Sequence, residues 1–267
     1  MLFLLYVNDM TRCLEKCNLY LYADDSCLVF QCKSVKTIND VLTKEFSNLC
    51  DWFIDNRLSI HFGRDKTKSI LFCPKRKKSK VESLDITYRD IKIHQHEKVS
   101  YLGCILDDTL NGESMALNVL NKINCWLAFL YRKQKFLTPY LRRLLCNSLI
   151  QPNFDYACLT WYPSLNKKLQ QRLQTAQNKC IRFCLQLSSR THIDSSHFKK
   201  LNWLSVQDRF SLMSATCTHK FVYSNCPKYI HDILNLMNCP NETRNSFLRL
   251  SQPCPKPSYA AKRLSHT

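Results

Sequence analysis

Two adjacent carboxylates are the residues of this sequence with the most specific chemistry. Asp24 and Asp25 follow Tyr22 and lie between two short apolar segments, 19–22 and 27–30. Neighbouring carboxylates repel each other, and a bound cation relieves that repulsion. Mg²⁺ takes oxygen ligands and is commonly held by one or two carboxylates together with substrate phosphates. Two such ions about 4 Å apart can stabilise the attacking and leaving oxygens of a phosphoryl transfer. An Asp-rich β-turn without metal is the alternative.

Charge is distributed unevenly along the chain. Of the 267 residues, 39 are Lys or Arg and 21 are Asp or Glu, which gives a formal net charge of +18. The first 110 residues hold 17 basic and 15 acidic side chains, whereas the rest hold 22 basic and 6 acidic ones. Such a basic half is typical of proteins that bind a polyanion, nucleic acid above all. A generically basic surface is the alternative. The sequence has 3 glycines, so glycine-rich nucleotide-binding loops are excluded.

The 16 cysteines match neither a disulfide framework nor a zinc motif. The sequence has no Cys-x-x-Cys pair, and most cysteines stand among apolar residues, which indicates reduced thiols in a core. The apolar segment 2–7 ends at Asn8 and is far shorter than the roughly 20 residues of a membrane span. We therefore expect no zinc, no membrane and an intracellular location, in the nucleus or the cytoplasm.

The first 110 residues are expected to form an antiparallel sheet with one long helix against it. The segments around Asp24-Asp25-Ser26 are rich in residues that favour strands, which predicts a hairpin with its turn at these three residues. Ser34 is a suitable N-cap, and apolar residues then recur with helical spacing to about Asn56. Further short strands are predicted at 58–62, 69–73, 86–88, 91–94 and 99–106.

Helices are expected in most of the remaining chain. Thr138-Pro139 has the form of an N-cap followed by proline at the first helical position. The residues from 239 onward are rich in Pro and Ser, which predicts a loose tail. The fold class is therefore α+β. The helices are predicted at 114–136, 138–149, 164–183 and 206–223.

Four segments resemble, in order, motifs of the reverse transcriptases of non-LTR (LINE-type) retrotransposons. Tyr22-Ala23-Asp24-Asp25 is similar to the Y-A-D-D box of that family. The other three are LFLLYVNDM at 2–10, LSI at 58–60 followed by KTK at 66–68, and YLGCILD at 101–107, which is similar to the primer-grip motif. Segments at 151–161 and 176–182 resemble the region that follows the polymerase core. The resemblance covers roughly residues 1–235.

The resemblance implies catalytic roles for matching residues. Asp24 would be the principal Mg²⁺ ligand and Asp25 the supporting carboxylate, as part of a two-metal site. Lys66 would lie near the triphosphate of the incoming nucleotide, and a solvated lysine is the alternative. Tyr22 would pack near that nucleotide or the primer end. The family's third metal-binding Asp and its fingers have no counterpart here, so we expect an incomplete site and no polymerase activity of the chain by itself.

The resemblance also implies residues that bind an RNA template and a DNA primer. Tyr101, Leu102 and Gly103 would form the turn that supports the primer terminus. Basic residues of the thumb would contact phosphates of the nucleic acid. These residues are Arg132, Lys133, Arg142 and Arg143, with Lys135 beside them. Further basic residues recur on the next long helix, at Lys167, Lys168, Arg172, Lys179 and Arg182.

The domains follow from the same resemblance. Residues 1–110 would be the C-terminal part of a partial polymerase palm and 111–162 an all-helical thumb. Residues 163–238 would be a helical post-thumb region and 239–267 a flexible tail. The sequence thus predicts a fragment of an RNA-directed DNA polymerase. Two alternatives stay open: a non-catalytic remnant that binds nucleic acid, and an unrelated α+β interaction protein whose paired Asp residues are accidental.

Overall fold

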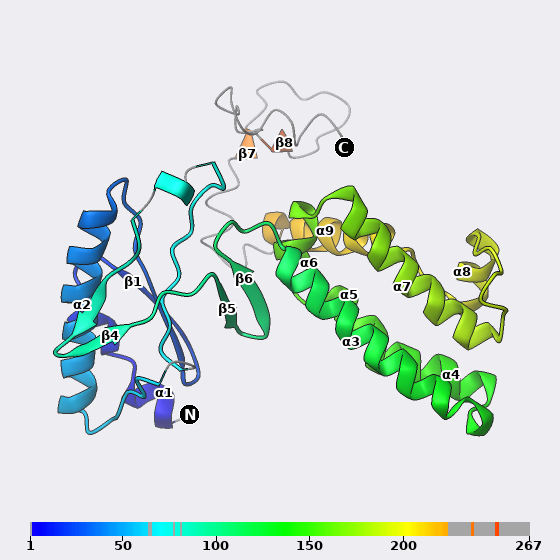
Figure 1. Cartoon of the computed structure of the whole chain (residues 1–267), viewed down its shortest axis with the longest axis horizontal. Coiled ribbons are helices and arrows are strands. Elements are labelled where there is room, and N and C mark those ends of the chain that lie inside the picture. Colours follow the sequence, from blue (N-terminus) through cyan, green and yellow to red (C-terminus); the bar gives the residue numbers. More distant parts are fainter. Residues whose placement is uncertain are drawn as a thin grey trace. The chain divides into compact units, whose positions relative to one another are not determined.

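The chain divides into two compact units, Met1–Val206 and Gln207–Thr267. Their structure is a computed structural model, and it describes residues 2–63, 66–76, 78–80, 82–223, 236–237 and 249–250. The described part is mixed α+β and mostly helical, with three small antiparallel hairpins in the first unit (Figure 1). The predicted α+β class is confirmed. The predicted domain boundaries at 110/111 and 162/163 lie inside the first unit and stay predictions.

A long helix organises the first 110 residues. Helix α2 spans Val35–Asp55, and the Ser34 hydroxyl accepts a hydrogen bond from the Thr37 amide, so the predicted N-cap is confirmed. One stretch of α2, around Ile38, packs against the strands of the second hairpin in a buried cluster. The stretch around Leu49 packs against the N-terminal segment and the first hairpin. Helix α1 (Leu2–Tyr6) and the 3-10 turn η1 (Met10–Cys13) form that N-terminal segment.

The strands form separate two-stranded hairpins instead of the single sheet that the sequence suggested. The pairs are β1 (Asn18–Tyr22) with β2 (Asp25–Val29), β3 (Ile86–Tyr88) with β4 (Ile91–Ile93), and β5 (Lys98–Tyr101) with β6 (Cys104–Asp107). The predicted strands at 58–62 and 69–73 are wrong, because only Ser69 makes a bridge, to Gln95. Phe62 packs instead against α2 and the second hairpin. Its ring meets Phe46 of α2 edge to face with centroids 6.3 Å apart and stacks on Tyr88 of β3 with centroids 5.8 Å apart.

The helical part follows the sequence prediction closely. Thr138 accepts a hydrogen bond from the Leu141 amide, and Pro139 occupies the first helical position, as expected. The long helix predicted from residue 164 begins later, because Asn166 caps it through the Leu169 amide, 2.9 Å away. The helices are α3 (Glu113–Arg132), α4 (Pro139–Leu145), α5 (Gln151–Asp155), α6 (Cys158–Trp161), α7 (Lys167–Leu185), α8 (Ser195–Leu201) and α9 (Val206–Tyr223). Short turns lie between them, at η3 (Gln134–Phe136), the π-turn η4 (Cys146–Ile150) and η5 (Tyr162–Ser164).

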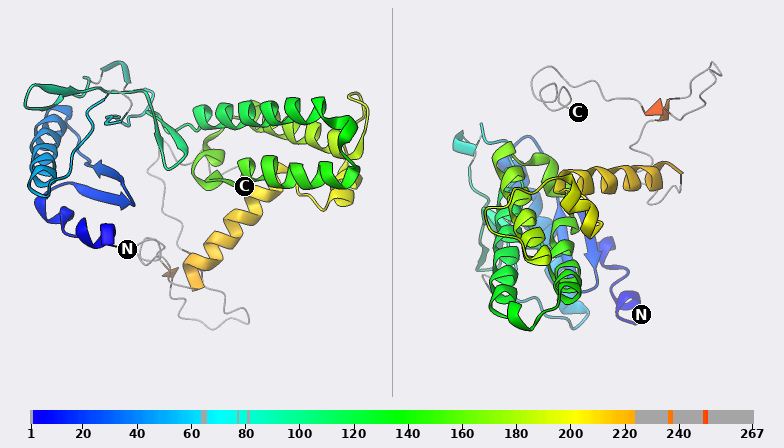
Figure 2. Two further views of the ribbon diagram at one scale, coloured as in Figure 1. Left: turned by 90° about the horizontal axis from the view of Figure 1, so that it is seen from below. Right: turned by 90° about the vertical axis from the view of Figure 1, so that its right-hand side faces the viewer.

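Helices α3 and α7 lie side by side and form the core of the helical part (Figure 2). Ile123 and Leu130 of α3 and Leu173 of α7 are at most 1% exposed. At the far end of the pair, the rings of Tyr131 and Phe183 meet edge to face with centroids 4.9 Å apart. Apolar residues therefore fill one face of each helix, and most polar residues of the two helices lie on the other faces.

The second unit contains α9 beyond Val206 and one short pairing. Strand β7 (Leu236–Met237) pairs antiparallel with β8 (Arg249–Leu250). The predicted tail, 239–267, lies outside the described residues except for that second strand. None of the described helices combines the length and the apolar character that a membrane crossing requires. The cysteines of the described part are free thiols, and burial raises the pKa of Cys50 to about 12.

The junction between β6 and α3 depends on a close backbone approach at Gly112. This residue has a φ of 72°, and a Cβ atom there would lie 2.4 Å from the carbonyl oxygen of Trp161. We expect Gly112→Ala to lower the free energy of unfolding by about 2 kcal/mol or more, because the backbone must move. Urea unfolding followed by circular dichroism measures this loss.

Gly63→Ala is the matched control for this prediction. A Cβ at Gly63 would lie 3.4 Å from its nearest neighbour, a ring atom of His61, and needs no displacement of backbone. An unfolding midpoint of Gly112→Ala that equals the parent midpoint would contradict the close approach.

Candidate functional site

The paired carboxylates stand at the tip of the first hairpin, exposed to solvent. Tyr22 pairs with Asp25, so the turn consists of Ala23 and Asp24, and Ala23 takes the left-handed conformation with a φ of 53°. The turn predicted at residues 24–26 is therefore displaced by one residue, because Asp25 already belongs to β2. Alternate residues of β1 pack inward, which leaves Tyr22 66% exposed beside the two Asp side chains.

Asp24 and Asp25 fit Mg²⁺ in donor type but supply only part of a ligand set. Their carboxylate oxygens are the ligands that Mg²⁺ prefers. Among the described residues, no group of three or more His, Cys, Asp or Glu side chains is placed to hold a metal ion. The remaining ligands would have to be water, substrate phosphate or a carboxylate from elsewhere.

The predicted primer-grip residues form the turn of the third hairpin. Leu102 and Gly103 join β5 to β6 with φ values of 47° and 74°, the two left-handed residues of a type I′ turn. The Tyr156 hydroxyl donates a hydrogen bond to the Leu102 carbonyl and holds the turn against the helical part. Burial raises the pKa of Tyr101, and the negative charge of Asp25 contributes to the rise. Tyr101 therefore lies within range of the charge of Asp25.

Lys66 is exposed in a turn after the first 60 residues. Its backbone amide donates to the Gly63 carbonyl, 2.9 Å away. Within the described residues, no hydrogen bond or ion pair joins the Lys66 side chain to Asp24 or Asp25. Its predicted place near a triphosphate stays a prediction.

The four basic residues predicted for the thumb have different surroundings. Arg132 and Lys133 are exposed at the end of α3, and Arg143 is half-buried on α4. Arg142 is 9% exposed, and its guanidinium donates to the backbone carbonyls of three residues in three segments. These acceptors are Gln134, Leu137 and Phe183. Arg142 therefore joins α4 to its neighbours and is left out of the interface that we propose.

A regular basic stripe runs along the outer face of α7. Lys168, Arg172 and Lys179 are exposed, with Thr175 between them, at intervals of four, three and four residues. These intervals place all four on one narrow face of a helix. In the described part of the chain, none of the three cations forms an ion pair. Arg182 differs, because its Nε atom donates to the Thr191 carbonyl, 3.0 Å away.

Two exposed aromatic residues on α3 were missed from the sequence. Trp126 and Phe129 are 38% and 44% exposed, and their rings meet edge to face with centroids 6.2 Å apart. The signal was present, because both lie off the apolar face marked by Ile123, Leu127 and Leu130.

No family model, curated protein or solved structure matches this chain.

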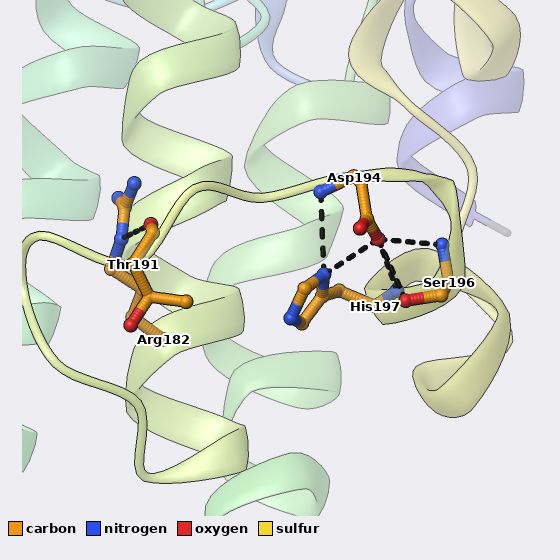
Figure 3. A network of polar contacts seen from close by, with 5 residues as sticks. All are labelled: Arg182, Thr191, Asp194, Ser196 and His197. Atoms are coloured by element: carbon orange, nitrogen blue, oxygen red, sulfur yellow. Dashed lines mark hydrogen bonds and ion pairs between the residues drawn. The ribbon is translucent and has the colours of Figure 1, made fainter.

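A Ser, a His and an Asp meet at the start of α8, and their geometry is that of a helix cap (Figure 3). One oxygen of Asp194 accepts from the Ser196 hydroxyl at 2.7 Å and from the Ser196 amide at 2.9 Å. His197 Nδ1 lies 2.8 Å from the same oxygen. Because the serine and the imidazole share one acceptor, the hydroxyl is not aligned on the imidazole as a nucleophile would be. The cluster stabilises α8.

This cap gives a pH-dependent prediction. Hydrogen bonds from Ser196 and His197 hold the pKa of Asp194 well below its usual range. The stabilisation is therefore complete above the unfolded pKa of about 3.9 and is lost as pH falls through the lower folded pKa. We expect Asp194→Ala to lower Tm at pH 7 and to lower it progressively less below pH about 4.

Thermal unfolding at several pH values measures the effect. Asp90→Ala removes an exposed carboxylate from the turn between β3 and β4 and is the matched control. A Tm difference between Asp194→Ala and the parent that stays constant down to low pH would contradict the cap.

Proposed function

We propose that this chain is part of an RNA-directed DNA polymerase of the non-LTR retrotransposon type, and that its helical part binds nucleic acid. The proposal is supported by the four ordered motifs, by the exposed carboxylate pair at a hairpin tip and by the basic face of α7. The partners would be an RNA template and a DNA primer, with a deoxynucleoside triphosphate as substrate of the complete enzyme. The basic face of α7 is the observation that carries the binding function.

Several features suit the stripe on α7 to phosphates. Residues 113–206 contain 14 Lys and Arg but 3 Asp and Glu, so few carboxylates compete for the cations. From Lys168 to Lys179 the helix rises by about 16 Å, a length that matches about five phosphates of one strand. Contacts of this kind supply affinity and orientation without reading sequence, as binding to a template–primer duplex of any sequence requires.

The catalytic part of the proposal concerns the hairpin tip. Asp24 and Asp25 would hold Mg²⁺, which when bound stabilises negative charge on phosphate oxygens. Tyr101 would act beside them as part of the primer-supporting turn, and Lys66 would neutralise charge on the triphosphate. A second candidate, a nucleic-acid-binding protein without polymerase activity, is favoured by the incomplete ligand set among the described residues.

Charge removal on α7 tests the binding function. We expect Lys168→Gln/Arg172→Gln to weaken binding to an RNA–DNA primer–template duplex and to reduce the slope of log K against log[salt] by about 1.8, because about two phosphate contacts are lost. Fluorescence anisotropy at several salt concentrations measures both quantities.

The control for this experiment is a double variant with the same loss of charge. Lys36→Gln/Lys44→Gln removes two exposed cations from the outer face of α2. Equal losses of affinity in the two double variants would show that only net charge matters and would contradict an interface on α7.

Primer extension separates the two candidate functions. The chain alone, with Mg²⁺, a primed RNA template and deoxynucleotides, is expected to give no extension, because two carboxylates do not complete a two-metal site. Adding a polymerase segment that supplies the further carboxylate should restore extension if the chain is catalytic, and Asp24→Asn should then abolish it. Restored extension that survives Asp24→Asn would contradict the assigned metal ligand.

A further inference from the structure

The outer face of α3 combines aromatic rings with cations. Lys122, Trp126, Phe129 and Lys133 follow one another at intervals of four, three and four residues, and all four are exposed. These intervals place them along one narrow strip of the helix, beside the buried face that packs on α7, and Lys133 is the C-cap residue of α3. The two rings touch each other edge to face in the middle of the stripe, with one lysine toward each end.

Exposed aromatic rings at these positions indicate a surface that binds a partner. Burying a large aromatic side chain is favourable, and contiguous apolar groups on a surface mark interaction sites. Glu113 is the single acidic residue of α3, whereas Lys122, Arg132 and Lys133 flank the rings. The partner must therefore be anionic and must present flat apolar surfaces.

An unpaired nucleic acid strand has both properties. Its phosphates are anionic, and its bases present faces on which aromatic side chains stack. A duplex has the same phosphates, but its base faces are stacked on one another and are closed to side chains. The α7 stripe has Thr175 at the position that corresponds to Phe129 of α3, and it has no aromatic ring that could stack on a base.

We propose that the outer face of α3 binds a single-stranded segment of nucleic acid, with Trp126 and Phe129 stacked on unpaired bases and Lys122 and Lys133 on the flanking phosphates. This inference rests on the proposed binding function and adds a second contact surface to it. The stripe from Lys122 to Lys133 extends over about 16 Å of helix, enough for a few nucleotides. The unpaired strand would be the template end next to the duplex.

Binding to two matched ligands tests this proposal. One is a blunt RNA–DNA duplex, and the other is the same duplex with an unpaired oligouridine end on the RNA strand. Trp126→Ala/Phe129→Ala is expected to weaken binding of the tailed duplex by about 10-fold or more and to leave the blunt duplex unchanged, because only unpaired bases lose a stacking partner. Circular dichroism checks that the variants keep their helices.

Phe72→Ala is the matched control, since it removes a phenyl ring that is 45% exposed in another part of the chain. It should bind both ligands as the parent does. Equal losses for the tailed and blunt duplexes in Trp126→Ala/Phe129→Ala, or no loss at all, would overturn the proposal. Binding of an acidic peptide to the α3 face, together with no binding of the tailed duplex to that face, would also overturn the proposal.

Photocrosslinking gives an independent test. With 4-thiouridine in the unpaired end, tryptic digestion should yield the crosslink in peptide 123–132, which lies between Lys122 and Arg132 and contains both rings. A crosslink confined to peptides outside α3 would overturn the proposal. Failure of the proposed function is a distinct result, because the parent protein would then show no salt-dependent binding to either duplex.

Discussion

The packing of α3 against α7 is the constraint from which the proposed binding surfaces follow. Each helix buries one apolar face, with Ile123 and Leu173 fully enclosed. Since a helix repeats every 3.6 residues, fixing the buried face also fixes which residues point to solvent. The outer residues of both helices recur at intervals of four, three and four. On α7 this register displays cations, and on α3 it displays two rings between two lysines.

Local signals in the sequence were sufficient for most helices of the fold. The side chains of Ser34 and Thr138 form the expected caps, because an N-cap is decided within one turn of helix. Strands were harder to predict, since a strand requires a partner that local sequence does not specify. Segment 58–62 has the composition of a strand, yet its Phe62 is held by aromatic packing against Tyr88. The same apolar residues serve either arrangement.

The candidate site was predictable in composition and less so in environment. The Asp24-Asp25 pair was visible as a polar centre between strands. The register of the hairpin, however, depends on Ala23, which takes a left-handed conformation that is not expected of an alanine. Arg142 and Arg143 are adjacent and chemically identical, and only tertiary packing decides that the first is buried against carbonyls. The aromatic face of α3 could have been found by plotting Trp126 and Phe129 on the helix.

The two proposed activities, nucleic-acid binding and two-metal catalysis, differ in how accurately their groups must be positioned. Attraction between a basic helix and phosphates acts over about 8–10 Å at moderate salt, so it tolerates small errors of position. Two-metal catalysis requires ligands held within about half an ångström, with every coordination position supplied. The faces of α3 and α7 carry the groups that binding needs, whereas Asp24 and Asp25 require further ligands. The proposed binding of nucleic acid therefore places weaker demands on the position of its groups than the proposed catalysis, which depends on a further segment.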